Sequence, residues 1–165
     1  MSGFSMAGWA GFLSTEAQAA AGLAGLIFVA LSINLPRILA TEGLPERAAE
    51  SVIMLVGVLI VCSNGLVPDR TQYATGQSFL STGAVMWLLP SYFQLKAARR
   101  KISQPLLSFA ARIALTQLAT LPFIIAGVLL MAGDANGLDW LAPGAGFCFI
   151  ASTINAWVLL VEILR

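Results

Sequence analysis

Five long apolar segments, separated by short polar breaks, constrain the fold of this chain more than any other feature. An α-helix needs about 20 mostly apolar residues to cross the roughly 30 Å hydrocarbon core of a membrane. Segments of this kind run over about residues 15–39, 46–67, 71–95, 104–132 and 142–164. We therefore expect residues 1–165 to form one all-α transmembrane domain, an integral membrane bundle of five spanning helices.

The composition supports a membrane environment and excludes several classes of site. Hydrophobic residues make up 58% of the chain and charged residues 10%, whereas soluble domains carry about 25% charged residues. The net charge of +1 gives no reason to expect a nucleic-acid partner. The chain has no histidine, and both lysines lie in one polar stretch, so we expect no metal and no cofactor.

The basic residues predict the orientation of the bundle. All but two of the arginines and lysines would flank the segments on one side, and Arg112 lies within the fourth segment. The opposite side would carry Arg70 among four acidic residues, Glu16, Asp69, Asp134 and Asp139. Because loops with an excess of Lys and Arg stay in the cytoplasm, we expect the N-terminus outside and the C-terminus inside.

Arg112 is the most informative residue for function, because charged side chains within membrane segments often mark sites. It belongs to a polar stripe at i+4 spacing, formed by Ser108, Arg112, Thr116 and Thr120. Glu50 and Glu162 would lie in the same cytoplasmic half, so we predict a cluster of Glu50, Arg112 and Glu162. The alternatives are an arginine that extends to the surface or has a structural partner, and a local pair of Glu162 with Arg165.

Two further groups of residues are candidates for sites. Pro36 has no N–H and should kink or end the first helix, so that Asn34 and freed carbonyls beside Arg37 could coordinate a cation or a water. The third segment carries one hydroxyl face, formed by Thr71, Thr75, Ser78 and Thr82. Such a face suits a wetted pore, and it equally suits hydrogen bonds between packed helices.

Small residues and cysteines suggest structural roles. Ala17, Ala21 and Gly25 follow one another at i+4 spacing, a ridge typical of packing between membrane helices. Cys62 and Cys148 each lie five residues inside the outer end of their segments. Equal depth permits a disulfide between them, but the sequence does not give the geometry that a disulfide requires.

Three stretches resemble a known family: AGLIFVALSINLPRIL at 24–39, LPERA at 44–48 and INAWVLLVEILR at 154–165. They are similar to small bacterial polytopic membrane proteins that are often labelled modulators of FtsH protease. This resemblance implies the bacterial inner membrane as the location. It also implies a regulatory association with a membrane-bound AAA protease.

No nucleophile–base pair, phosphate-binding loop or carboxylate dyad is evident, so we do not expect an enzyme. Three functions remain, namely a homo-oligomeric channel or pore for ions or small solutes, an accessory or regulatory subunit of a larger membrane complex, and a monomeric carrier or lipid-binding bundle. We favour the homo-oligomeric pore slightly, because polar stripes run along two of the five segments. Its partners would be the lipid bilayer and further copies of the chain, and a membrane-protein partner fits the second function.

Overall fold

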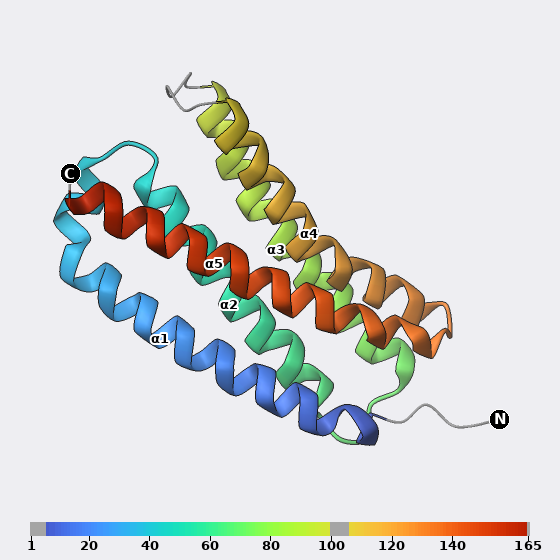
Figure 1. Cartoon of the computed structure of the whole chain (residues 1–165). Helices are drawn as coiled ribbons and strands as arrows, with labels where there is room; N and C mark the ends of the chain where they lie inside the picture. Colours follow the sequence, from blue (N-terminus) through green and yellow to red (C-terminus); the bar gives the residue numbers. More distant parts are fainter. Residues whose placement is uncertain (1–5, 100–105, 165) are drawn as a thin grey trace.

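The computed structural model describes residues 6–99 and 106–164, and the side chains of residues 106–108 and 162–164 lie outside that description. The described residues confirm the predicted all-α class with five long helices, and they contain no strand. In chain order the elements are η1 (Ala7–Trp9), α1 (Ala10–Ala40), α2 (Leu44–Gly65), α3 (Gln72–Arg99), α4 (Leu106–Met131), η2 (Ala135–Trp140) and α5 (Leu141–Leu164), where η marks a short 3₁₀ segment. Figure 1 labels the five α-helices.

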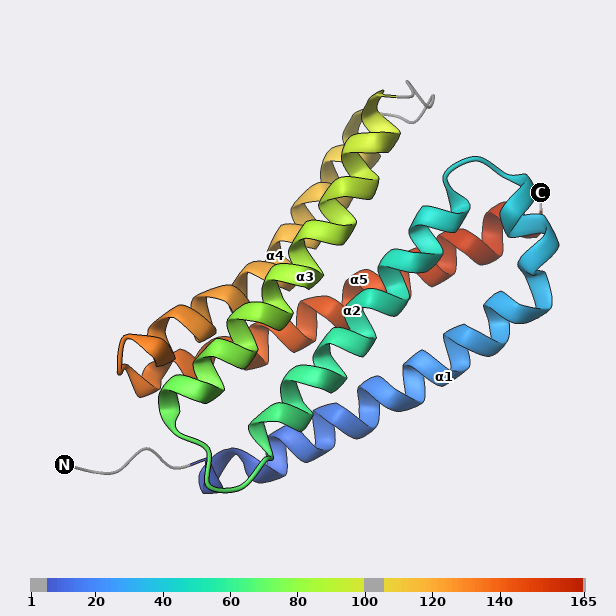
Figure 2. The same cartoon turned by 180° about the vertical axis from the view of Figure 1, so that it is seen from behind.

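The helices run alternately up and down, so their ends gather at two ends of the molecule. One end holds the connection between α1 and α2, the close of α3, the start of α4 and the close of α5. We call it the basic end, because Arg37, Arg47, Lys96 and Arg99 lie there. Toward this end, the paired helices α3 and α4 diverge from α1, α2 and α5 in both views (Figures 1 and 2).

The helix boundaries differ from the predicted ones for local reasons. The first helix begins at Ala10 rather than near residue 15, and it continues through Pro36 to Ala40 instead of ending there. Gly43 precedes α2 with a φ of 84°, a left-handed conformation that glycine adopts without a steric penalty. Thr71 lies just before α3, where its hydroxyl accepts a hydrogen bond from the Ala74 N–H, as an N-cap residue does.

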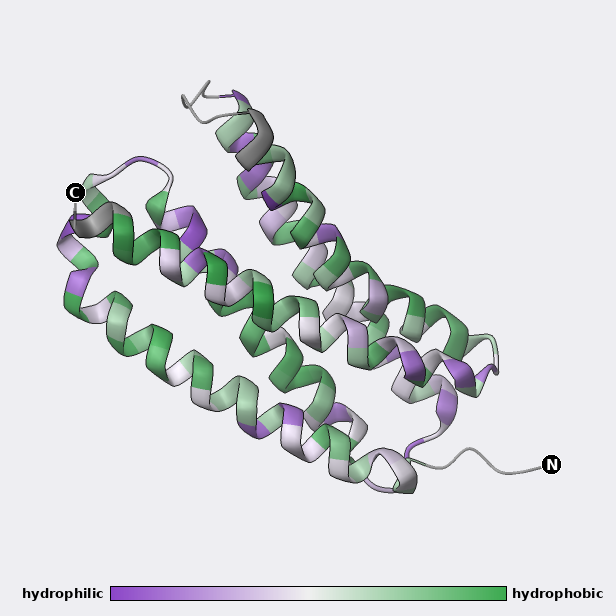
Figure 3. Cartoon of the chain, in the orientation of Figure 1, coloured by the Kyte–Doolittle hydropathy of each residue, from purple (hydrophilic) through white to green (hydrophobic). Residues whose placement is uncertain are grey.

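Four of the five helices are long and apolar enough to cross a membrane, as judged over the described residues alone. They are α1, α2, α4 and α5, each counted with any adjoining 3₁₀ segment that belongs to its span. The remaining helix, α3, is long enough but contains many Thr, Ser and Gln residues. Figure 3 shows hydrophobic colour along much of the length of the helices, with hydrophilic colour at many helix ends and at a few places within the helices.

The closest helix–helix seam joins α3 to α4, and glycines make it possible. A Cβ atom added at Gly76 would lie 2.8 Å from the carbonyl oxygen of Gly127, and one at Gly127 would lie 2.5 Å from the backbone nitrogen of Leu80. Gly83 faces Ile124 in the same way, at 3.1 Å from its nitrogen. The backbones of α3 and α4 therefore touch where a side chain would hold them apart.

The first helix lies at the periphery and uses a different face from the predicted ridge. Leu13 and Ala20 are fully buried against the main core, while Ala21 and Gly25 are exposed. A Cβ added at Gly25 would meet nothing within 4 Å. Of Ala17, Ala21 and Gly25, only Ala17 lies against the core, so the predicted ridge is not a packing face between helices of this chain.

Replacement of Gly127 by alanine should destabilise the protein. The new methyl group would collide with backbone atoms of α3, and overpacking of this kind costs about 1–3 kcal/mol of unfolding free energy. Detergent-solubilised protein titrated with a denaturing detergent would give that free energy. The matched control is Gly25→Ala, where the space is open and the helix propensity of alanine should leave stability equal or higher by up to ~1 kcal/mol. Equal stability of the two variants would contradict the seam.

Candidate functional site

A buried ion pair between α2 and α4 is the centre of the candidate site. Arg112 donates from Nε to Glu50 Oε2 at 2.9 Å and from Nη2 to Glu50 Oε1 at 2.7 Å. The two parallel bonds make a bidentate pair, the strongest common geometry between arginine and a carboxylate. Glu50 has 0% and Arg112 has 6% of its surface exposed, so neither charge is solvated from outside the bundle.

The pair forms because the two residues have the same depth. Each lies six residues after the first residue of its helix, Leu44 or Leu106, and both helices start at the basic end. At 1.5 Å per residue, both side chains leave the backbone about 9 Å from that end. Arg112 is therefore paired inside the bundle and does not extend to the surface.

A third helix completes the surroundings of the pair through Gln94. The Gln94 amide donates from Nε2 to the Thr116 hydroxyl at 2.7 Å, and it also lies against the Glu50 carboxylate. Thr116 in turn donates to the Arg112 carbonyl at 3.0 Å. Gln94 is only 4% exposed, so α3 contributes a buried amide to the site.

Sequence reasoning missed Gln94, although a signal for it exists. Gln94 follows Gly83 by eleven residues, which is three helical turns, and therefore shares the face that packs against α4. We predicted a hydroxyl face of this helix from Thr71, Thr75, Ser78 and Thr82. Thr75 and Thr82 each precede a glycine of the seam by one residue, so this face lies about 100° around the helix from the glycine face. A polar side chain on the glycine face was the better indicator.

The fifth helix contacts α2 at the residue next to Glu50. Ser152 donates to the backbone carbonyl of Ser51 at 3.3 Å, and both residues are buried. Asn155, which is 5% exposed, lies nearly one turn further along α5 toward the basic end. Four helices therefore place buried polar side chains in the half of the bundle that contains the ion pair.

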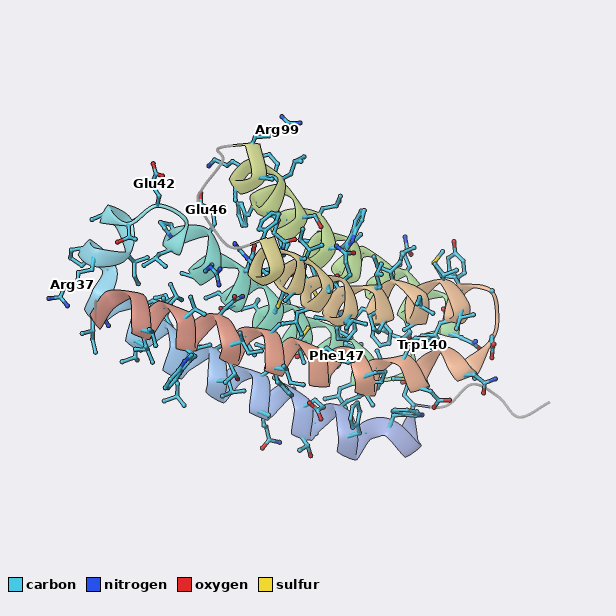
Figure 4. The ribbon with its side chains drawn as sticks, turned by 45° about the horizontal axis from the view of Figure 1, so that its top comes forward. Arg37, Glu42, Glu46, Arg99, Trp140 and Phe147 are labelled. Atoms are coloured by element: carbon cyan, nitrogen blue, oxygen red, sulfur yellow. The ribbon has the colours of Figure 1, made fainter. Side chains whose placement is uncertain are left out.

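A second ion pair joins α2 to α3 nearer the surface. We call the paired helices α3 and α4 the hairpin. Lys96 Nζ on α3 lies 3.7 Å from Glu46 Oε1 on α2, and their side chains are 40% and 17% exposed. Exposed pairs of this kind contribute about 0–1 kcal/mol. Figure 4 shows Glu46 and Arg99 at the basic end with Glu42 and Arg37, and Trp140 toward the opposite end.

Two of the three residues in the predicted cluster, Glu50 and Arg112, are in contact. Glu50 and Arg112 are bonded to each other, whereas the side chain of Glu162 lies outside the described residues, as does that of Ser108. The predicted group at the end of the first helix is not gathered around a common point. Asn34 donates to the Ala30 carbonyl at 3.0 Å within its own helix, and Pro36 and Arg37 are exposed.

Most side chains of the two predicted polar stripes are covered, fully or in part, by other parts of the same chain. On α4, Thr116 and Thr120 are buried, and each hydroxyl donates to the carbonyl four residues earlier. On α3, Thr75 is buried and does the same, while Thr82 is half-buried. Ser78 accepts a hydrogen bond of 2.8 Å from Arg70 Nη1, which ties the loop before α3 to the helix.

The two cysteines are buried and free in the structure, so the permitted disulfide is not formed. Cys148 instead lies 3.5 Å from the Ala119 carbonyl on α4. Among the described residues, no three or more His, Cys, Asp or Glu side chains lie close enough together to hold a metal ion. The chemistry that the site offers is therefore one compensated charge pair with amide and hydroxyl groups beside it.

Comparisons with protein-family models, with curated proteins and with solved structures find no match to this chain. The resemblance of residues 24–39, 44–48 and 154–165 to the family named above therefore stays an expectation. The buried pair and the polar groups beside it are the features of this chain that bear on function.

Removal of one member of the pair should cost much more stability than removal of both. Glu50→Ala leaves the Arg112 guanidinium buried without its partner, which typically costs about 3–5 kcal/mol. Glu50→Leu combined with Arg112→Met removes both charges and should recover most of that loss. Unfolding free energies in detergent would measure both variants, with the exposed Glu42→Ala as the control. An equal loss in the single and double variants would show that the two charges are not coupled.

Proposed function

We propose that this chain is an integral protein of the bacterial inner membrane that crosses it five times, with the N-terminus outside. Four helices already meet the length and composition of a span. The 28 residues of α3 reach about 42 Å at 1.5 Å per residue, which exceeds the hydrocarbon thickness. Its polar residues are tolerable in lipid because several of them face α4 or bond within the helix.

Cysteine labelling would test this topology. The native Cys62 and Cys148 are buried and should react little. Asp69→Cys, between α2 and α3, should react in intact cells with a maleimide that cannot cross the membrane. Glu42→Cys and Arg99→Cys, at the basic end, should react only after permeabilisation. Labelling of Arg99→Cys in intact cells would contradict the passage of α3 and α4 through the membrane.

We further propose that the protein lets ions or small solutes cross the membrane, along a path that passes Glu50 and Arg112. The observation that carries this proposal is the buried bidentate pair between α2 and α4, with the Gln94 amide of α3 against it. Ionisable groups inside membrane bundles commonly mark ion pathways, since their burial costs energy that an apolar core would avoid.

The arrangement of the helices suggests how such a path could open. The pair connects α2 to the hairpin of α3 and α4, and this hairpin diverges from α2 and α5 toward the basic end (Figures 1 and 2). A small outward movement of the hairpin would separate Arg112 from Glu50 and admit water from the cytoplasmic side. In this proposal each subunit has its own path, and a homo-oligomer would combine several paths.

Flux into liposomes that contain only this protein would test the proposal. Wild-type protein should pass K⁺ or H⁺ above the rate of protein-free liposomes. The Glu50→Leu/Arg112→Met variant should fold and lose that flux, because it keeps the packing without the charges. Glu42→Gln, which changes an exposed carboxylate at the same end, should behave like the wild type. Flux from the folded double variant equal to that of the wild type would refute a role for the pair.

The second candidate function is an accessory or regulatory subunit of a larger membrane complex, such as a membrane-bound protease. It is favoured by the exposure of α1: only 11% of its most apolar stretch is buried, against 56% in α2. A largely uncovered helix is available to neighbouring membrane proteins as well as to lipid. Absence of flux from folded protein, together with co-purification of a protease, would favour this function.

A further inference from the structure

A half-open groove separates α1 from α5 near the basic end. It is open along one side and is bounded by side chains from both helices. Ala30 on α1 and Ala156 on α5 face it, and their small side chains leave the space between the helices unfilled. The other lining residues are all apolar except one amide: Ile27, Leu31, Asn34, Ile38, Leu159 and Leu160.

The base of the groove is a well-packed apolar surface. Ile38 and Leu159 are buried together with Leu44 and Ala48 of α2, and Leu31 packs against them. The space therefore does not lead into the bundle, and its occupant must enter from the side. A membrane would place acyl chains along that side, because both flanking helices are apolar and exposed there.

The charges at the basic end favour an anionic headgroup. Arg37 lies one turn beyond Asn34 and next to Ile38, both of which line the groove, and its side chain is exposed at the end of the molecule (Figure 4). Among the described residues, this end has five basic residues, Arg37, Arg47, Lys96, Arg99 and Arg112, and four acidic ones, Glu42, Glu46, Glu50 and Glu162. The excess of one positive charge favours anionic lipid, as basic sites at the cytoplasmic face of membrane proteins do.

We propose that this groove binds one acyl chain of an anionic phospholipid whose headgroup lies beside Arg37. The chain fills the space between Ala30 and Ala156, and the Asn34 side chain lies where the apolar part gives way to the polar part. The site rests on the proposed membrane insertion and orientation, but it does not depend on ion passage. It assigns to α1 and α5 a ligand that the Glu50–Arg112 site does not involve.

Lipid retention by purified protein tests the proposal directly. Wild-type protein in detergent is mixed with phosphatidylglycerol or phosphatidylcholine, and bound lipid is counted by native mass spectrometry. We expect one retained phosphatidylglycerol, held about fivefold more tightly than phosphatidylcholine. Arg37→Gln should remove that preference, since one basic residue near the surface contributes about that factor. Arg99→Gln, at the same end but on α3, should retain it.

Filling the groove should remove the lipid. Ala30→Phe places a ring in the space, whereas Ala21→Phe places the same ring on an exposed part of the same helix. Loss in the first variant alone supports the site, and Ala156→Leu tests the opposite wall if Ala30→Phe does not fold. Equal retention of both lipids, equal effects of the two phenylalanines, or a dimer mass in place of bound lipid would overturn the proposal. The Glu50→Leu/Arg112→Met variant should still bind lipid, which separates this site from ion passage.

Discussion

The arrangement of the basic end depends on one interaction, the buried pair of Glu50 and Arg112. Moving two charges out of water costs several kcal/mol each, and only close, well-oriented contact offsets that cost. The bidentate geometry supplies it, and it tolerates little displacement of α2 along α4. Gln94 and Thr116 then extend the fixed geometry to α3, because the Gln94 amide bonds the Thr116 hydroxyl and lies against the carboxylate. One pair thus sets the relative depth of three helices.

The sequence predicted the five helices because their signal is strong and local. Runs of about 20 apolar residues between polar breaks leave few alternatives, and the observed bounds differ mainly at the start of α1 and at the end of α3, which continues to Arg99. The meeting of Glu50 and Arg112 followed from depth, since two charges at one level of a bundle must compensate each other. Gln94 and the buried face of α1 could not be found in this way. Which side of a mostly apolar helix is covered depends on its neighbours. Ala20 and Ala21 are the same residue type, yet Ala20 is buried and Ala21 is exposed.

The two polar stripes also show that the sequence does not reveal which face of a helix is covered. Thr116, Thr120 and Thr75 recur at helical spacing, and a pore and a packed interface predict the same spacing. Their hydroxyls bond backbone carbonyls four residues earlier, and they lie buried within one bundle. These residues therefore give no support to a path along a central axis of several subunits. We therefore propose a path inside one subunit, past the charged pair, in place of the pore between subunits that the stripes suggested.

The distribution of packing explains why ionic contacts hold the hairpin at the basic end. The main apolar core gathers residues such as Phe79, Phe123 and Leu130, where the α3–α4 hairpin packs closely with the other helices. At the basic end, Leu44 and Ala48 of α2 pack with α1 and α5 instead. The opposite face of α2 carries Glu46 and Glu50, four residues apart, and these bind Lys96 and Arg112 of the hairpin. One turn of α2 therefore joins the two diverging parts through the polar contacts of its two carboxylates, so a change in these contacts would alter their separation without disturbing the apolar core.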